Sequence, residues 1–471
     1  MKPQHLVIIG GVASGPTAAV EARRTNPDLN ITLIEKGPDV SYSACEMPLM
    51  LAGKVQHKDE LVRYAPHELA TAFNIAVETH TSAEEIDLEH RKLLVRNTKT
   101  GKSRLIRYDR LILATGALPI VPEALAISTQ DVFVLRTLQD VLYIENRIKA
   151  QDVHHAVVIG SGYVGLDAAF ALKQRGIRVT VLAPSGVLAK GLGETMQAVA
   201  LQRITSEGLC VRKERATGLE KARDGKIIAV LTDKGEKIGC DLVLIAVGTS
   251  PATELARKAG LKIGVSGGVV VDEQMRTSEL GIWACGDCTE QKELIFGVSL
   301  AAPLSLNAFR SGRVAGRNAA RNAPRNESNP MPRTKAAPPS GRSATLPPIV
   351  FAAAIGLGDI EIAHTGWTQE MASKLGKDTV SATITHKTAS TFTDHSTICI
   401  TLIAERKTQR LIGAQIVGGN RSADRINVIT ALLRKGGTVG DLYDLDYVYS
   451  PPLAPSKDPL MVAARSLQKQ F

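Results

Sequence analysis

One cysteine near the start of the chain has a setting that suits nucleophilic or redox chemistry. Cys45 lies within the segment SYSACEMPLM, residues 41–50, and no second cysteine stands beside it. Pro48 follows three positions later, which favours a helix start. A thiol at a helix start would face unpaired backbone N–H groups and have a lowered pKa. Cys45 is therefore either a nucleophile or a small core side chain, and this segment alone leaves both open.

The residues before Cys45 have the order of a nucleotide-binding unit. Residues 6–15, LVIIGGVASG, form an apolar strand that runs into a glycine turn, and residues 17–24 have helical character. A second strand, residues 31–35, ends on Glu35. Glycines let the backbone approach a pyrophosphate, the helix N-terminus binds it, and an acid at this separation binds a ribose hydroxyl. This order predicts a dinucleotide-binding βαβ unit.

The same pattern occurs a second time. Residues 156–165, AVVIGSGYVG, and the strand at 179–183 repeat the glycine turn and the second strand. Each unit also has a similar later strand, at residues 108–119 and 240–251. An internal duplication of dinucleotide-binding domains explains both features. Two dinucleotides in one chain predict a flavin and a nicotinamide, with a hydride passing between them.

Composition limits the remaining possibilities. A chain of 471 residues predicts about three domains, and scattered rather than paired cysteines favour a reducing cytoplasm. We expect no signal peptide and no membrane span, because the chain starts almost directly with a strand and has no sufficiently long apolar stretch. The net charge of +10 suits anionic coenzymes or is simply a solvated basic surface. With 4% aromatic residues, the chain shows no basic stripe interleaved with aromatics, so we expect no nucleic-acid partner.

The C-terminal third has a different organisation. Residues 321–348 are rich in Pro, Arg, Ser and Asn without periodicity, which predicts a linker or an exposed excursion. Beyond it, strand-like runs at 396–404 and 411–417 precede a helical segment at 423–435. This order predicts an α+β domain. The fold class expected for the whole chain is therefore α/β, with two Rossmann-like domains and a C-terminal α+β domain.

Specific motifs make the chain resemble the flavoprotein disulfide reductases, and within them the single-cysteine branch. That branch contains coenzyme A-disulfide reductases, NADH oxidases and peroxidases, and NAD(P)H polysulfide reductases. The motifs that carry the resemblance are GGVASG at 10–15, SYSAC at 41–45, GIWACGDC at 281–288, GAQIV at 413–417 with RIN at 425–427, and YSPP at 449–452 with DP at 458–459 and AA at 463–464.

The resemblance implies a domain order and a homodimer. Two segments would build the FAD domain and enclose the NAD(P)H domain, and the C-terminal domain would dimerise. The boundaries are 1–119 and 252–320 for the FAD domain, 120–251 for the NAD(P)H domain, 321–348 for the linker and 349–471 for the dimerisation domain.

The resemblance also implies roles for individual residues. FAD and NADPH or NADH would be held by Gly10, Gly11, Ala13, Ser14, Gly15, Glu35, Lys36, Ser41, Ala114, Thr115, Gly116, Gly160, Gly162, Tyr163, Val164, Gly165, Ser185, Gly248, Gly286 and Asp287. Of these, Asp287 would bind the ribityl chain, and Tyr163 resembles the residue that covers the flavin until nicotinamide enters. The residues expected to contact the substrate are Arg23, Ser41 and Ser43.

By the same resemblance, Cys45 would be the redox thiol. Without a neighbouring cysteine it would cycle between a thiolate and a mixed disulfide, persulfide or sulfenate. Tyr449 matches a tyrosine that coenzyme A-disulfide reductases bring to the neighbouring subunit's cysteine; it would protonate the departing thiolate, or merely pack at the dimer seam. Ala13 stands where the peroxidases and oxidases have a histidine, which favours a sulfur substrate over peroxide.

Several points stay open at this level. Arg23 and Arg24 match a basic pair that meets coenzyme A phosphates, or they form the solvated end of a helix. Ala44 and Glu46 depart from the branch's usual residues beside the cysteine. Coenzyme A disulfide, coenzyme A persulfide and polysulfide are all candidate substrates. The rival functions are an NAD(P)H oxidase that reduces oxygen and a flavin-bound sensor or binding protein without significant turnover.

Two smaller signals complete the predictions. The second strand of the nicotinamide unit ends VLAPS, residues 181–185, with no acid, which favours NADPH held by Ser185 or Lys190 but leaves NADH open. Cys285 and Cys288 form a C-x-x-C pair. Because two thiols do not complete a zinc site, we predict a structural role for this pair and no metal.

Overall fold

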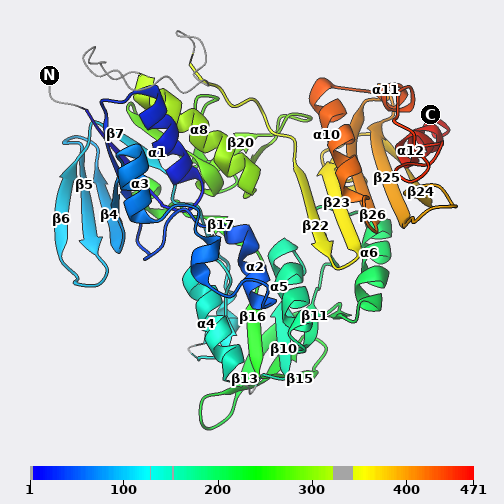
Figure 1. Cartoon of the computed structure of the whole chain (residues 1–471), viewed down its shortest axis with the longest axis horizontal. Helices are drawn as coiled ribbons and strands as arrows, with labels where there is room; N and C mark the ends of the chain where they lie inside the picture. Colours follow the sequence, from blue (N-terminus) through cyan, green and yellow to red (C-terminus); the bar gives the residue numbers. More distant parts are fainter. Residues whose placement is uncertain (1–3, 128, 151–152, 322–342) are drawn as a thin grey trace.

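The computed structural model describes residues 4–127, 129–150, 153–321 and 343–471. Figure 1 shows three lobes, with the N-terminal strands in the first, a second lobe below them, and the C-terminal strands in the third. Two lobes contain parallel sheets and the third contains an antiparallel sheet. The fold class predicted from the sequence is confirmed.

The first lobe is built on a parallel sheet of apolar strands that are buried on both faces. Leu6, Val7 and Ile8 have no exposed surface. The last strand of this sheet comes from far along the chain and pairs with the strand before the second lobe. In sheet order the strands are β19 (Ile282–Ala284), β7 (Arg110–Leu113), β1 (His5–Ile9), β2 (Asn30–Ile34) and β3 (Ala76–Glu78).

Two helices form one layer over this sheet (Figure 1). They are α1, Ser14–Thr25, and α8, Ser305–Arg321, and they pack directly on each other. Their close approach requires a glycine, because a Cβ at Gly316 would lie only 2.2 Å from the carbonyl oxygen of Ala18. The two helices are thereby fixed relative to each other.

Four strands of the second lobe repeat the order of four strands of the first, as the proposed duplication requires, whereas the edge strand comes from the start of this lobe and not from its end. All its neighbouring strands are parallel. The chain enters and leaves this lobe through a short antiparallel pair, β8 (Ala117–Pro119) and β17 (Thr249–Pro251). In sheet order the strands are β9 (Val132–Phe133), β16 (Leu242–Ile245), β10 (His155–Ile159), β11 (Arg178–Leu182) and β12 (Cys210–Arg212).

The third lobe is an antiparallel sheet whose two faces serve different partners. Side chains alternate between the faces, so Ile398 and Ile400 pack under helices of the same lobe, whereas Cys399 belongs to a core shared with the second lobe. In sheet order the strands are β22 (Ala352–Leu357), β23 (Ile360–Gly366), β26 (Leu411–Gly418), β25 (Thr397–Glu405) and β24 (Thr379–Lys387). The strands and the helix predicted between residues 396 and 435 are confirmed.

The remaining elements complete the three lobes. The helices are α2 (Met47–Leu51), α3 (Pro66–Phe73), α4 (Leu138–Lys149), α5 (Tyr163–Gln174), α6 (Glu194–Ser206), α7 (Glu254–Lys258), α9 (Gln369–Lys374), α10 (Ile426–Lys435), α11 (Val439–Tyr443) and α12 (Pro459–Gln468). The small-sheet strands are β4 (Thr81–Asp87), β5 (Lys92–Asn97), β6 (Ser103–Arg107), β13 (Ala216–Lys221), β14 (Ile227–Thr232), β15 (Lys237–Gly239), β18 (Val269–Val270), β20 (Thr289–Lys292) and β21 (Ser299–Ala301). Within the described ranges, none of the helices is long and apolar enough to cross a membrane.

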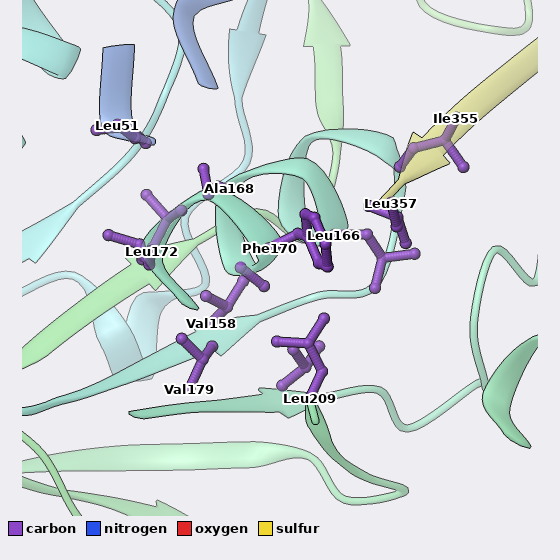
Figure 2. Packing of buried hydrophobic residues seen from close by; sticks show 14 of the residues in the cluster. Leu51, Val158, Leu166, Ala168, Phe170, Leu172, Val179, Leu209, Ile355 and Leu357 are labelled. Atoms are coloured by element: carbon purple, nitrogen blue, oxygen red, sulfur yellow. The ribbon is translucent and has the colours of Figure 1, made fainter. Parts of the chain in front are cut away.

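Helix α5 lies at the centre of a core that crosses lobe boundaries. In Figure 2 its side chains Leu166 and Phe170 lie near Ile355 and Leu357 of β22, while Leu51 of α2 approaches it from another direction. The core therefore connects the helix after Cys45 with the second lobe and with the C-terminal sheet.

The predicted linker differs from the structure at both of its ends. Arg321 is the last residue of α8, and Leu346 is buried, with its N–H donating to the carbonyl of Glu273 at 2.7 Å. Residues 322–342 lie outside the described residues. The apolar residue in this polar segment explains the error, because Leu346 packs into the core of the first lobe.

The turn at Gly160 gives a direct test of the second Rossmann-like unit. Its φ is +110° and an added Cβ would lie 2.3 Å from the carbonyl oxygen of Ala246, whereas Gly176 has a similar φ, +82°, with nothing within 4 Å. Gly176→Ala should cost about 1 kcal/mol, the strain of a left-handed residue. Gly160→Ala should lower the melting temperature several times more. Equal shifts for the two variants in thermal unfolding would contradict the close approach.

Candidate functional site

Cys45 lies where segments of both Rossmann-like lobes come together. Its thiol interacts with Ser305 at the start of α8, with Asp287 after β19, with Asp167 on α5 and with Arg136 just before α4. Cys45 itself has exposed surface. An accessible thiol surrounded by charged and hydrogen-bonding groups from both units suits a redox role better than a core role.

The surroundings raise the pKa of the Cys45 thiol. Desolvation by the protein around the sulfur is the main cause, and the negative charges of Asp287 and Asp167 add to it. A hydrogen bond with Ser305 and the positive charge of Arg136 act in the opposite direction. The thiol is therefore the dominant form at neutral pH in the chain alone.

The prediction of a lowered pKa at a helix start is wrong. Cys45 is the middle residue of a single 3₁₀ turn, Ala44–Glu46, and α2 begins only at Met47, with Pro48 in its first turn as predicted. A helix of five residues contributes a small dipole. Desolvation and two carboxylates outweigh it.

The first glycine turn fits a bound dinucleotide such as FAD. Gly10 has φ +111°, and an added Cβ would lie 2.1 Å from the carbonyl oxygen of Ala114, so the turn is pressed against the next strand end. Helix α1 starts after Ala13 with no side-chain cap and no acid in its first turn. Its first N–H groups are therefore available to a phosphate.

Glu35, which the sequence analysis assigns to a ribose, is held by two backbone N–H groups. One carboxylate oxygen accepts the N–H of Gly11 at 2.7 Å and the other accepts the N–H of Gly37 at 2.8 Å. An ionised carboxylate has further lone pairs beyond these two bonds. The side chain is thus fixed by the backbone and still able to accept ribose hydroxyls.

Asp287 carries an ion pair that the sequence did not predict. It lies in the 3₁₀ turn Gly286–Cys288, and its carboxylate pairs with Arg136 at 3.0 Å.

Thr115, after β7, donates its hydroxyl to the carbonyl of Ala252 at 2.7 Å. That bond joins the two strand segments through which the chain enters and leaves the second lobe.

The second glycine turn has the same geometry as the first. Gly160 and Gly165 occupy the places of Gly10 and Gly15, and α5 starts at Tyr163 with no side-chain cap and no acid in its first turn. The other predicted cofactor residues lie at strand ends of the two sheets or in the turns, loops and helix starts that follow: Gly11, Ser14, Lys36, Ser41, Gly116, Gly162, Val164, Ser185, Gly248 and Gly286.

The structure contradicts the predicted contact between Arg23 and substrate. Arg23 is 3% exposed and its guanidinium donates to the carbonyls of Phe73, Pro27 and Asn74. It therefore closes the end of α3 rather than facing an anion, and it is no solvated helix end either. Arg24 is exposed and pairs with Glu21.

The other predicted substrate residues lie in the loop before Cys45. Ser41 is buried with φ +51°, and Ser43 is half-buried. The N–H of Ser43 donates to the carbonyl of Leu61 at 2.8 Å, which fixes the loop. Both serines flank the thiol closely in sequence, so this part of the prediction stays open.

Within the described residues, Tyr449 makes no contact with Cys45 of its own chain. It is 61% exposed, and its apolar neighbours Val448 and Leu453 are 84% and 54% exposed. These three side chains form a run of exposed side chains in the third lobe.

The Cys285–Cys288 pair is buried, as a structural role requires. Both residues have no exposed surface, and the Cys288 thiol donates to the carbonyl of Cys285 at 3.3 Å. Burial raises the pKa of both thiols. Neither is placed to act as a nucleophile.

Three residues of the site escaped sequence reasoning. Ser305 and Arg136 belong to no motif, and each reaches Cys45 only because distant segments fold together. Asp167 lies on α5, and burial raises its pKa to about 6. No local pattern in the sequence could have shown these contacts.

Family models match nearly the whole described chain. A model described as pyridine nucleotide-disulphide oxidoreductase matches residues 4–312, and its dimerisation domain matches residues 352–459.

Individual relatives align over almost their full length. An NADH oxidase from Methanocaldococcus jannaschii is 31% identical over 468 residues, covering 99% of both proteins. A CoA-dependent NAD(P)H sulfur oxidoreductase from Pyrococcus furiosus is 31% identical over 470 residues, covering 99% of this chain and 100% of that one. The structure of a NAD-dependent persulfide reductase from A. fulgidus superposes with a TM-score of 0.91 at 31% identity, covering 99% of this chain and 83% of that one.

Opposite substitutions around Cys45 should move its pKa in opposite directions. Ser305→Ala removes a hydrogen bond that lowers the pKa and should raise it, whereas Asp167→Asn removes a negative charge and should lower it. We expect each shift to be about half a unit to one unit, the effect of one hydrogen bond or one nearby charge. The pH dependence of iodoacetamide alkylation of the reduced protein measures it. Shifts in the same direction would contradict the described surroundings.

Proposed function

The chain belongs to the pyridine nucleotide-disulphide oxidoreductase family, and on that premise we propose that it is an FAD-dependent NAD(P)H oxidoreductase that reduces a disulfide, persulfide or polysulfide through Cys45. The observation that carries the proposal is the accessible Cys45 thiol beside groups from both dinucleotide units, Asp287 and Asp167.

In the proposed reaction, the Cys45 thiolate attacks one sulfur of the substrate. A new S–S bond to Cys45 forms, the substrate's S–S bond breaks, and the second sulfur leaves as a thiolate that takes a proton. A bound FAD would supply the two-electron link from NAD(P)H that reduces this mixed disulfide or persulfide and restores the free thiol. Arg136 stabilises negative charge at Cys45, and Ser305 donates a hydrogen bond to it.

We assign the proton donor to Tyr449 of a second copy in a homodimer. The match of residues 352–459 to a dimerisation domain supports this assembly, as does the exposure of Tyr449 with its apolar neighbours. A phenol donates a hydrogen bond at neutral pH and can protonate a departing thiolate.

All six cysteines are free, which supports the predicted reducing cytoplasm.

The substrate class is a low-molecular-weight sulfur compound. The Pyrococcus furiosus relative is named as CoA-dependent, which supports coenzyme A disulfide or persulfide. The burial of Arg23 removes one predicted contact to coenzyme A phosphates. Polysulfide therefore stays beside the coenzyme A derivatives in the proposal.

Oxygen reduction is the second candidate. The Methanocaldococcus jannaschii relative is named NADH oxidase, and Cys45 is accessible enough to form a sulfenate. Ala13 has no exchangeable proton, which disfavours oxygen reduction as the function. Oxygen uptake that exceeds sulfur turnover under matched conditions would promote this function over the first.

Removal of the thiol tests the assignment. Cys45→Ser should lower polysulfide and coenzyme A disulfide reduction by about a thousandfold, because the hydroxyl is a poor nucleophile without a base. Bound flavin and its reduction by NAD(P)H should persist. Cys210→Ser is the matched control, since Cys210 is the other exposed cysteine, and it should leave the rate unchanged. Wild-type rates of sulfur reduction in Cys45→Ser would refute the assignment.

The donor is proposed to be NADPH. Ala183 follows β11 where Glu35 follows β2, so the acid that binds a ribose in the first unit is missing in the second. Ser185 and Lys190 are exposed beyond it and can meet a 2′-phosphate.

An acidic side chain introduced at position 183 should reverse the proposed preference for NADPH over NADH. Ala183→Glu should weaken NADPH use relative to NADH by at least about tenfold through repulsion of the 2′-phosphate. Ala183→Gln, of the same size without the charge, is the control. Steady-state kcat/KM for both donors decides the question, and equal ratios in the two variants would contradict NADPH as the donor.

A further inference from the structure

Two buried polar residues of the C-terminal sheet face the second lobe. His364 of β23 and Gln415 of β26 are cross-strand partners, and they are 5% and 3% exposed. By strand alternation they share a face with Ile362 and Val417, which belong to the core that includes α5 and α6. Neither residue has a role in the chemistry at Cys45, so their burial against the nicotinamide lobe requires another explanation.

Gln415 holds the loop between β11 and α6. Its side-chain oxygen accepts the N–H of Gly193 at 2.9 Å, and Gly193 is the residue before the first residue of α6. The loop follows Ala183 and carries Lys190, so it is the segment that the proposed NADPH ribose would meet. The sheet of the third lobe therefore holds in place the loop between β11 and α6, which is the proposed contact to the nucleotide in the second lobe.

His364 contacts the same loop and the start of α5. Gly191 lies so near its ring that an added Cβ would be 2.2 Å from Nε2. The ring also stacks on Tyr163, with centroids 6.1 Å apart and planes 26° from parallel. Burial lowers the pKa of His364 to about 4, so the imidazole stays neutral across physiological pH.

The Tyr163 hydroxyl makes no hydrogen bond within the described part of the chain. It is buried, and burial raises its pKa above the ordinary value of a phenol. An unpaired buried hydroxyl costs free energy, so the stack on His364 and apolar packing must hold the ring. Because Tyr163 directly follows Gly162 of the glycine turn, its position affects the entrance of the nucleotide site.

We propose that the His364–Gln415 pair is a positioning platform that sets the nicotinamide loop and Tyr163 at the same time. Through it, the C-terminal domain fixes the nucleotide site of its own chain in addition to its dimer contact. This inference rests on the proposed function only in that the second lobe binds NAD(P)H.

Equilibrium binding of NADP⁺ and NAD⁺ to the flavin-loaded protein tests the platform without turnover. Gln415→Leu leaves the Gly193 N–H unpaired and should weaken binding about tenfold. His364→Ala should weaken it to a similar extent, and His364→Phe, which keeps an aromatic ring, should restore most of it. Thr430→Val is the control, because it breaks a hydrogen bond with Thr365, whose side chain lies on the face of β23 opposite His364.

A second-site variant separates contact from general destabilisation. Gly191→Ala places a methyl group against the His364 ring and should weaken nucleotide binding, whereas Gly191→Ala combined with His364→Ala should bind no worse than His364→Ala alone. Additive losses would overturn the contact.

The outcomes also separate this inference from the proposed function. If wild type binds a nucleotide and Gln415→Leu and His364→Ala bind it equally well, the platform is overturned and the role of Cys45 is unaffected. If the variants bind weakly while the pH dependence of Cys45 alkylation is unchanged, the platform is supported. If wild type binds neither nucleotide, the proposed function is overturned together with the platform.

Discussion

Close backbone contact between a glycine turn and the neighbouring strand end is the constraint on which the rest of the structure depends. At Gly10 and at Gly160 the backbone approaches the next strand so closely that no side chain fits, and φ is +111° and +110°. Because both turns are fixed in this way, α1 and α5 begin at defined places with unobstructed first turns. The two dinucleotide sites and the cysteine between them follow from these helix positions.

Opposing electrostatic effects act on the pKa of the Cys45 thiol, and together they do not strongly favour the thiolate. Desolvation and the carboxylates of Asp287 and Asp167 keep the thiol protonated, while Ser305 and Arg136 favour the thiolate. The ion pair between Arg136 and Asp287 joins two of these opposing groups. A thiol of this kind attacks a reactive sulfur–sulfur bond, where the leaving group matters as much as the thiolate fraction.

Sequence patterns predicted what depends on local periodicity and spacing. The two glycine turns, Glu35 and the later strands could be found because each lies at a fixed separation from its neighbours. The interactions of Ser305, Arg136 and His364 could not, since they form between segments more than ninety residues apart in the sequence. Arg23 shows the opposite error: its position in a motif suggested a ligand contact, but its side chain satisfies three backbone carbonyls.

The covalent state of Cys45 is the most direct test of the account. The protein should be mixed anaerobically with polysulfide and its peptides measured by mass spectrometry before and after NADPH or NADH is added. The account predicts a persulfide or polysulfide on Cys45 that the reduced nucleotide removes, with Cys210 modified no faster than a free thiol. An unmodified Cys45, or a modification that the nucleotide cannot discharge, would contradict it.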